Sequence, residues 1–201
     1  MEFGFTQRMT PSSYERFLNA GFRRSGQMIY RPSCKGCQEC QPIRILAQQF
    51  RPDRSMRRCW RANQDLVSQM GPPLLSTEKT ELYQRYISTR HDKEDPAGPE
   101  DFLYLTPVES REVEFRLDGE LVSVAIVDTV PSGLSAVYTF FAPEQATRGL
   151  GTYAVLWEIE YCRQHDLPYV YLGYYIRDSR KMNYKTRFQQ YQIRQHGGEW
   201  I

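Results

Sequence analysis

Residues 134–175, LSAVYTFFAPEQATRGLGTYAVLWEIEYCRQHDLPYVYLGYY, decide the fold of this chain. The stretch opens with β-branched and aromatic residues, which favour a strand, and Pro143 ends that strand. Residues 148–166 then change to helical periodicity, with Val155 and Ile159 on one face. Strand composition returns in the last seven residues. This order predicts two parallel strands joined by a right-handed crossover helix.

Such units bind ligands beyond the carboxyl ends of their strands. Gly149 and Gly151, at the start of the helix, would meet the segment around Tyr174 at that edge. We therefore expect the chemistry of the protein there.

Composition predicts one compact domain, or one domain with a small appendage, from 201 residues of which 40% are hydrophobic. No run of about 18 apolar residues exists, so no membrane span is expected. The N-terminal MEFGFTQRM lacks the apolar stretch of a secretory signal. Five cysteines, an odd number, suit a reducing compartment, and we expect a cytoplasmic protein.

Charge is distributed unevenly behind a net value of +2. Residues 1–61 hold 12 Lys or Arg and 4 Asp or Glu, residues 62–176 hold 8 and 18, and residues 177–201 hold 6 and 2. A polyanion would be attracted to the two ends and repelled by the middle. The alternative is that these charges only solvate the surface.

Further elements follow from local signals. Helices are expected over 11–22, with Ser12 and Glu15 as a capping box, and over 55–70 and 77–91. A strand meander is expected over 113–141, with a hairpin turn at Asp118-Gly119, and a closing hairpin over 191–201. The charged segment 91–101 is expected to be a loop. A boundary near Pro72 would divide a basic, cysteine-containing N-terminal subdomain (1–72) from the main domain (73–201).

Cys34, Cys37 and Cys40 form a C-x2-C-x2-C motif. Thiolates at this spacing are able to hold zinc or an iron–sulfur cluster, and the alternative is a reduced structural turn. The candidates for a fourth ligand are Cys59, His91, His165 and His196.

Arg54, Arg57, Arg58 and Arg61 recur at helical spacing, so one helix face carries four guanidinium groups. Their mutual repulsion would be relieved by a phosphate backbone, which predicts a nucleic-acid contact rather than a plain solvated face. Trp60 lies beside them and either stacks on a base or packs in the core.

The Gly149–Gly151 turn resembles the pyrophosphate loop of GNAT acyltransferases. That loop begins with Gln or Arg three residues before its first glycine, where this chain has Ala146, so coenzyme A is not expected. Asp128 ends an apolar strand and either caps the turn at Ser132-Gly133 or faces a cavity. Tyr138, Phe140 and Tyr171 either line a pocket or belong to the core, and Lys181 and Lys185 are either solvated or bind an anion.

Six segments together resemble the aminoacyl-tRNA–protein transferases, in the branch of the bacterial aspartate/glutamate leucyltransferases. The resemblance covers about residues 14–200. The segments are GFRRS (21–25), the cysteine motif followed by QPIRI, FRPDRSMRR, VDTVPSGLSAVYTFFAP, GLGTYAVLWEIEYC and YLGYYIRDSRKMNYK.

The resemblance implies an α+β, GNAT-like acyltransferase fold with a mixed sheet and a small cysteine-containing N-terminal subdomain. It also implies transfer of leucine from leucyl-tRNA to the N-terminal Asp or Glu of proteins, which marks them for degradation through the N-degron pathway. The cysteine motif would bind an iron–sulfur cluster or zinc. Members of the family carry a further cysteine upstream of Gly21, so the metal site is expected to be incomplete here. They also carry a glycine-rich stretch where this chain has DKEDPAGPED, a loop expected near the substrate.

The implied reaction is aminolysis of the ester that joins the amino acid to tRNA. An α-amine with a pKa of about 7.7–8.0 is roughly a tenth unprotonated at pH 7, so positioning would matter more than a strong base. Asp128 would orient or deprotonate the amine, and the backbone of Gly149, Gly151 and Thr152 would support the ester carbonyl. Lys181, Lys185 or Arg187 would pair with the acidic acceptor. The aminoacyl pocket would be lined by Tyr138, Phe140, Tyr171, Tyr174 and Tyr184.

Three alternatives remain open from the sequence. The donor would be arginyl-tRNA if the pocket held more acids than Asp128. The protein would be a GNAT N-acetyltransferase if it used acetyl-CoA, or a metal-responsive RNA-binding module if it had no activity.

Overall fold

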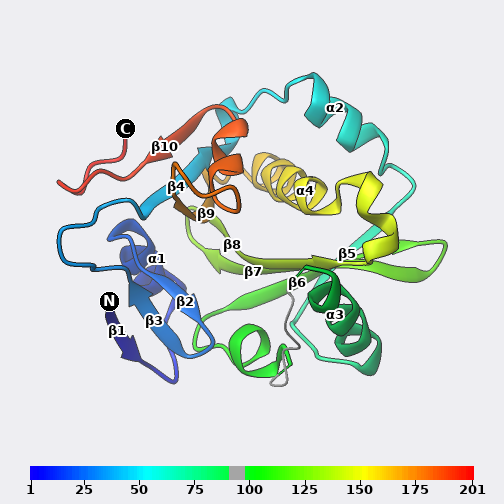
Figure 1. Ribbon diagram of the computed structural model, residues 1–201, viewed down its shortest axis with the longest axis horizontal. Helices are drawn as coiled ribbons and strands as arrows, with labels where there is room; N and C mark the ends of the chain where they lie inside the picture. Colours follow the sequence, from blue (N-terminus) through cyan, green and yellow to red (C-terminus); the bar gives the residue numbers. More distant parts are fainter. Residues whose placement is uncertain (91–97) are drawn as a thin grey trace.

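A seven-stranded mixed sheet carries the fold, in the order β10-β4-β9-β8-β7-β6-β5 (Figure 1). The computed structural model describes residues 1–90 and 98–201. The strands are β10 (Tyr191–Ile193), β4 (Gln41–Leu46), β9 (Tyr169–Tyr175), β8 (Gly133–Phe141), β7 (Glu120–Val130), β6 (Ser110–Leu117) and β5 (Val67–Gly71). Among the strands of the described residues, β8 and β9 form the one parallel pair in this sheet.

The predicted strand–helix–strand unit is confirmed, because α4 (Leu150–Gln164) connects the parallel strands β8 and β9. The two strands pair only from Gly133 and Tyr169 to Ser135 and Tyr171 and then separate. Gly133 permits this close start, since a Cβ there would lie 1.8 Å from the Tyr169 carbonyl oxygen. The separation beyond Ser135 leaves an opening in the middle of the sheet.

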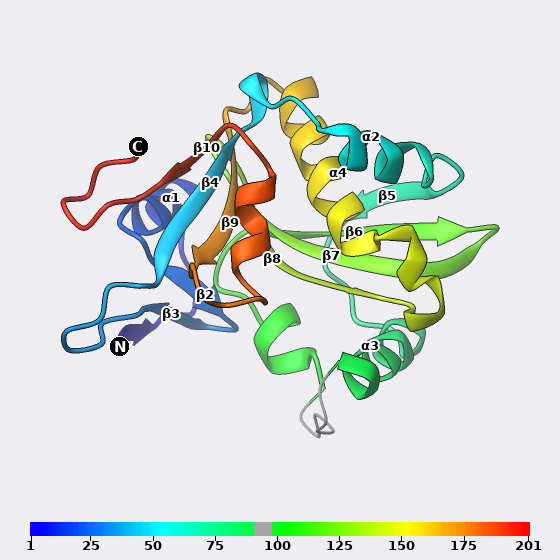
Figure 2. The ribbon, with the colours of Figure 1, turned by 45° about the horizontal axis from the view of Figure 1, so that its top comes forward.

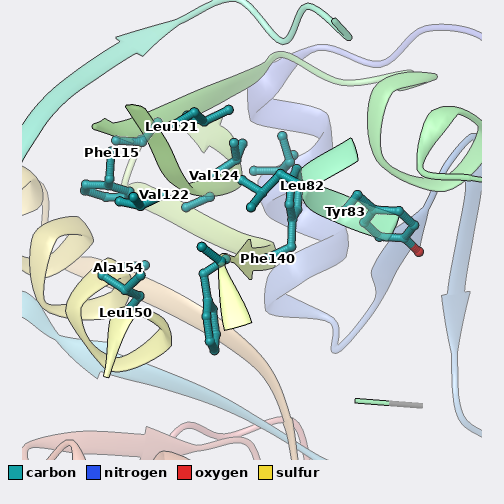
Figure 3. Close-up of a cluster of buried hydrophobic side chains, with 14 of the residues drawn as sticks. Leu82, Tyr83, Phe115, Leu121, Val122, Val124, Phe140, Leu150 and Ala154 are labelled. Atoms are coloured by element: carbon teal, nitrogen blue, oxygen red, sulfur yellow. The ribbon is translucent and has the colours of Figure 1, made fainter. Parts of the chain in front are cut away.

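Helices cover both faces of the sheet. α4 and α2 (Arg54–Arg61) lie on one side, and α3 (Thr77–Arg90) lies on the other (Figures 1 and 2). Buried side chains of α3, α4 and the central strands, among them Leu82, Phe115, Phe140 and Leu150, form the largest apolar cluster (Figure 3). Burial of these side chains is the main stabilising contribution to the fold.

A second, three-stranded sheet lies at the end of the molecule where both termini are found (Figure 1). Its order is β1 (Glu2–Phe5), β3 (Met28–Arg31) and β2 (Arg23–Ser25). The helix α1 (Pro11–Asn19) packs beside it against β7. The predicted capping box at Ser12 is wrong: Thr10 is the N-cap, and its hydroxyl accepts a hydrogen bond from the Ser13 N–H. Pro11 then occupies the first turn, where its missing N–H costs no hydrogen bond.

The helix predicted over 55–70 is wrong in its second half. α2 ends at Arg61, and Val67–Gly71 forms the edge strand β5, paired with β6. Pairing with β6 therefore overrides the local helical pattern of these residues. This pairing could not be predicted from the local sequence, because β6 lies about 40 residues further along the chain.

The domain boundary predicted near Pro72 stays a prediction. β4 and β5 both precede it in sequence, yet both are strands of the seven-stranded sheet. A division at that position would separate β5 from β6, to which it is hydrogen-bonded.

Short helical turns complete the described chain: η1 (Ala47–Gln49), the π-helical turn η2 (Glu100–Tyr104), η3 (Pro143–Arg148) and η4 (Asn183–Arg187). The substrate-facing loop predicted over 91–101 lies mostly outside the described residues, as does His91. Within the described part of the chain, no helix has the length and apolar character needed to cross a membrane.

Candidate active site between strands β8 and β9

The opening between β8 and β9 is a cleft with two connected parts. A larger cavity of about 640 Å³ lies toward the N-terminus of α4, and a smaller one of about 160 Å³ lies toward β2. The two cavities share five lining residues: Ala136, Val137, Leu172, Met182 and Lys185. The separation of these two parallel strands thus creates one continuous cleft within the sheet.

The larger cavity combines apolar walls with the start of a helix. Gly149, Gly151 and Thr152 line it at the N-terminus of α4. The Gly149 N–H donates to the Ala146 carbonyl oxygen and the Thr152 N–H to the Gly149 carbonyl oxygen, which leaves the N–H groups of Leu150 and Gly151 at the open end of the helix. Gly149 has a positive φ of 67°, which a glycine adopts without strain. The remaining lining includes apolar, aromatic and basic side chains: Val137, Phe141, Val155, Leu172, Tyr86, Tyr138, Tyr184, Arg180 and Lys181. Such a cavity suits an apolar group next to an anionic or carbonyl oxygen.

Three buried cations, Arg23, Arg24 and Lys185, line the smaller cavity, and Arg24 is paired with Asp128. Arg23 and Lys185 are the two that Asp128 does not neutralise. The Lys185 ammonium donates to the Tyr174 carbonyl oxygen at 2.6 Å. Burial, together with the nearby Arg23 guanidinium, lowers the pKa of Lys185 to about 7. Arg23 Nη1 donates to Ser135 Oγ at 3.1 Å, whereas its buried Nη2 has no hydrogen-bond partner. Two desolvated cations without a carboxylate form a site for an anion.

Gly173 allows both cations to reach the cavity. A Cβ at this position would lie 3.2 Å from Arg23 Nη2 and 3.6 Å from Lys185 Nζ. Its φ is also positive, at 83°. A side chain at position 173 would therefore displace the pair that defines the smaller cavity.

Asp128 is fully buried and lines neither cavity. Its two carboxylate oxygens accept from Arg24 Nε at 2.9 and 2.8 Å, and one of them also accepts from Ser110 Oγ at 2.6 Å. A carboxylate engaged in this way is poorly placed to deprotonate an incoming amine. Since successive side chains of a strand face opposite sides, this pair fixes β2 with Arg23 directed into the cavity.

Eight of the twelve residues predicted for catalysis or substrate binding line the cleft: Tyr138, Gly149, Gly151, Thr152, Tyr174, Lys181, Tyr184 and Lys185. Besides Asp128, three do not. Phe140 is fully buried and packs edge-on against Tyr83 of α3, at 5.5 Å (Figure 3). The Tyr171 hydroxyl donates to Asn19 Oδ1 at 3.1 Å, in a separate cluster. Arg187 points to Ser55 of the α2 region.

Arg23 was missed by the sequence analysis. The available signal was GFRRS, in which two adjacent arginines on a short strand must face opposite sides. The sequence did not show which of the two would be neutralised, because the partner, Asp128, is 104 residues away from Arg24.

The four arginines predicted to contact nucleic acid share one helix, α2, and all are exposed. Within the described part of the chain, none of them forms an ion pair. Asp53 caps the helix by accepting from the Met56 N–H at 2.8 Å. A row of unneutralised guanidinium groups is therefore presented to solvent.

Cys34, Cys37 and Cys40 are free and lie around a pocket of about 330 Å³. His196 lines the same pocket, together with Arg31 and Arg194. Among the described residues, no group of three or more His, Cys, Asp or Glu side chains is arranged to hold a metal ion. The thiols have the right donor chemistry but do not form a preorganised set. Of the other proposed fourth ligands, Cys59 contacts the Arg148 carbonyl and His165 stacks on Tyr161, so both lie elsewhere.

Glu158 of α4 is buried, and one of its carboxylate oxygens has no hydrogen-bond partner. Burial raises its pKa from 4.5 to about 8. The unfolded chain therefore ionises first, so the stabilising effect of the neutral carboxyl is complete below about pH 4 and is lost as the pH rises through about 8.

Glu158→Gln is expected to remove this pH dependence. Between pH 6 and pH 8 the wild-type protein should lose about 2 kcal/mol of unfolding free energy that the variant does not lose. Urea denaturation at both pH values measures the difference. Glu160→Gln, at a more exposed position on the same helix, is the control, and equal pH slopes for Glu158→Gln and wild type would contradict the prediction.

A parallel strand pair that separates around a cleft, with a crossover helix beginning at its edge, defines the class of GNAT-like acyltransferases. Solved structures share this fold: the structure of L-PGS from Bacillus licheniformis (TM-score 0.60, 11% identity, 77% of this chain and 57% of that chain) and FemX (TM-score 0.53, 11% identity, 84% and 61%). These likenesses confirm the predicted fold class.

The chain belongs to the arginine-tRNA–protein transferase family. It matches the family descriptions "Arginine-tRNA-protein transferase, N terminus" over residues 2–58 and "Arginine-tRNA-protein transferase, C terminus" over residues 78–195. Two similar proteins are aspartate/glutamate leucyltransferases. That of Marinobacter nauticus is 48% identical over 88% of this chain and 76% of its own length, and that of Nitrosococcus oceani is 46% identical over 93% and 81%. The predicted family and the prediction of an aminoacyltransferase are thereby confirmed.

Proposed function

We propose that this protein transfers leucine from leucyl-tRNA to the N-terminal Asp or Glu of acceptor proteins in the cytoplasm and so marks them for degradation. The observation that carries the proposal is the pair of buried cations, Arg23 and Lys185, with an unpartnered guanidinium N–H in the smaller cavity, which adjoins the larger cavity at the α4 N-terminus. An acidic side chain that leaves water needs such a cation in return. The names of the relatives support the same acceptor chemistry.

The acceptor's side-chain carboxylate would occupy the smaller cavity, between Arg23 and Lys185. Its α-amine would then point along the cleft toward Gly149 and Gly151 of α4. The leucyl ester would lie in the larger cavity, whose walls include Val137, Phe141, Val155 and Leu172. This order places the two reacting groups at the junction of the cavities.

The donor is proposed to be leucine rather than arginine. No Asp or Glu is among the described residues that line either cavity. An arginyl side chain would enter without a carboxylate partner and would meet Lys181 and Arg180 instead. A leucyl side chain requires only apolar contact.

In the reaction, the neutral α-amine of the acceptor attacks the ester carbonyl carbon. The first N–H groups of α4 support the negative charge that develops on the carbonyl oxygen. The C–O bond to the terminal ribose breaks, and the ribose hydroxyl receives a proton as the new peptide bond forms. Positioning of the two substrates by the cavities contributes most of the rate acceleration, since the amine needs no strong base.

The proposal is tested by incubating the protein with leucyl- or arginyl-tRNA and peptides that start with Asp, Asn or Lys. Transfer of labelled leucine to the Asp-starting peptide is expected, with little transfer to the other two peptides or from arginyl-tRNA. Transfer from acetyl-CoA, or equal use of all three peptides, would refute it.

We propose that the arginines of α2 bind the phosphate backbone of the tRNA. Changing Arg57, Arg58 and Arg61 together to alanine is expected to weaken tRNA binding at least about 10-fold and to reduce its salt slope by about 2, since each lost phosphate contact removes about 0.7–0.9. Filter binding at several salt concentrations measures both. Arg85→Ala, Arg111→Ala and Arg177→Ala combined provide a control that removes the same charge from solvent-accessible positions outside α2. An unchanged salt slope in the α2 variant would contradict the assignment.

We also propose that Cys34, Cys37 and Cys40 bind zinc or an iron–sulfur cluster, with His196 as a further ligand from the same pocket. The bound group would hold the cysteine segment and the C-terminal hairpin together. Cys37→Ser is expected to lose the metal, and His196→Ala to lower its content, by elemental analysis after anaerobic purification. Cys162→Ser, a buried cysteine of α4, is the control, and full metal content in Cys37→Ser would exclude the site.

A further inference from the structure

An apolar pocket of about 310 Å³ lies between α2 and α4, separate from the cleft. Its buried lining consists of Phe50, Met56, Leu156 and Ile159, and the half-buried Trp60 adds an aromatic wall. It has no lining residue in common with either cavity of the cleft. The volume is at the lower end of the range of about 300–1,000 Å³ that small ligands occupy.

Cations surround the opening of this pocket. Arg57 and Arg61 of α2 and Arg163 of α4 line it and are exposed. The acid among the lining residues, Glu160, reaches Arg163 only at 3.6 Å. Positive charge continues beyond the pocket, because Arg54 and Arg58 line the adjoining surface with Arg61. The pocket therefore suits a flat apolar group attached to a chain of anions.

Trp60 is held in place before any ligand arrives. Its indole packs on Tyr153 with ring centres 5.4 Å apart. A fixed aromatic surface is a platform on which a base can stack at little entropic cost.

We propose that the pocket between α2 and α4 receives one unpaired nucleobase of the tRNA, stacked on Trp60, with the flanking phosphates held by Arg57, Arg61 and Arg163. This inference rests on the proposed function and adds a base-binding site to the phosphate contacts of α2. An acidic peptide with one apolar anchor is less suited, because the unpaired guanidinium groups extend about 10 Å along α2, from Arg54 to Arg61. Successive phosphates match such a row, whereas one or two carboxylates do not.

The site lies close enough to the cleft for a single-stranded segment to reach both. Gly151 lines the larger cavity, and Ile159, eight positions later on the same helix, lines the pocket. That separation corresponds to about 12 Å along the helix axis.

The test compares a short single-stranded RNA with an abasic strand of equal length and charge. Wild-type protein is expected to bind the RNA about 10-fold more tightly than the abasic strand, since stacking requires a base. Trp60→Leu should bind the RNA no more tightly than the abasic strand, while its affinity for the abasic strand should equal that of the wild type. Trp157→Leu, which changes a tryptophan outside the pocket, should keep the ratio.

A second measurement does not depend on the folding of the Trp60 variant. Photo-crosslinking of 4-thiouridine-containing tRNA to wild-type protein should give a crosslinked peptide from residues 50–61 or 156–163. Equal binding of RNA and abasic strand to wild type, a ratio unchanged in folded Trp60→Leu, or crosslinks only elsewhere would overturn the proposal. So would Trp60-dependent displacement of the RNA by a peptide of alternating Leu and Asp. Leucyl transfer to the Asp-starting peptide is measured separately, and its absence in wild type would refute the proposed function. The difference in affinity between the RNA and the abasic strand tests the base-binding site independently of that result.

Discussion

Lys185→Met is expected to lower kcat/KM for an Asp-starting peptide about 100-fold, equivalent to about 2.7 kcal/mol. Truncating one member of a desolvated charge pair has an effect of this size, because the carboxylate would then enter the smaller cavity with Arg23 alone. The fold should tolerate the change, since Lys185 is a buried ammonium without a carboxylate partner and methionine has a similar shape. Steady-state kinetics together with a thermal melt measure both effects.

Lys181→Met is the matched control, because Lys181 lines the cleft but is exposed. Its effect should be several-fold smaller, since solvent screens an exposed charge. Full activity of folded Lys185→Met on the Asp-starting peptide would contradict the role of Lys185.

The pH dependence distinguishes a cation from a base at position 185. If Lys185 must be protonated to bind the acceptor, then its lowered pKa of about 7 makes kcat/KM fall as the pH rises above neutrality. The acceptor amine must lose its proton, so the rate should also fall at low pH. The permanently charged Lys185→Arg should keep much of the activity and lose the decline at high pH. An inactive Lys185→Arg with normal folding would instead indicate that Lys185 acts as a neutral base.

Asp128→Asn is expected to destabilise the protein by about 3–5 kcal/mol, because it leaves the Arg24 guanidinium buried without a counter-charge. Both side chains of this pair are 0% exposed, so solvent does not compensate for the loss. For a chain of this length the melting temperature should fall by about 10 °C.

Asp65→Asn is the comparison for Asp128→Asn. Asp65 pairs with Arg148 at the surface, where solvent screens the charges, so its loss should change the stability much less than the loss of Asp128. A stable but inactive Asp128→Asn would restore the catalytic role predicted from the sequence. A large loss of stability with the residual folded protein still active would support a positioning role through Arg24 and β2.

The sequence by itself determined the central unit of the fold. The run of β-branched and aromatic residues before Pro143, the glycines at 149 and 151 and the helical spacing of Val155 and Ile159 are local signals, and each depends on residues only a few positions apart. The Asp118-Gly119 hairpin, which is confirmed, was predicted from a local signal of the same kind. The motifs of the family could likewise be recognised without a structure, because each is a short continuous stretch of sequence.

Only the tertiary structure decided which of these residues share the site. Arg23 and Arg24 are neighbours in sequence and both line the smaller cavity, but only Arg24 is neutralised, by an ion pair with Asp128 that is 104 residues away in the chain. Phe140 and Tyr171 lie outside the cleft because each packs against a helix: Phe140 against Tyr83 of α3, and Tyr171 against Asn19 at the end of α1. The cleft exists only because two strands that pair for three residues then separate, and no window of sequence contains both strands and the layers that pack on them.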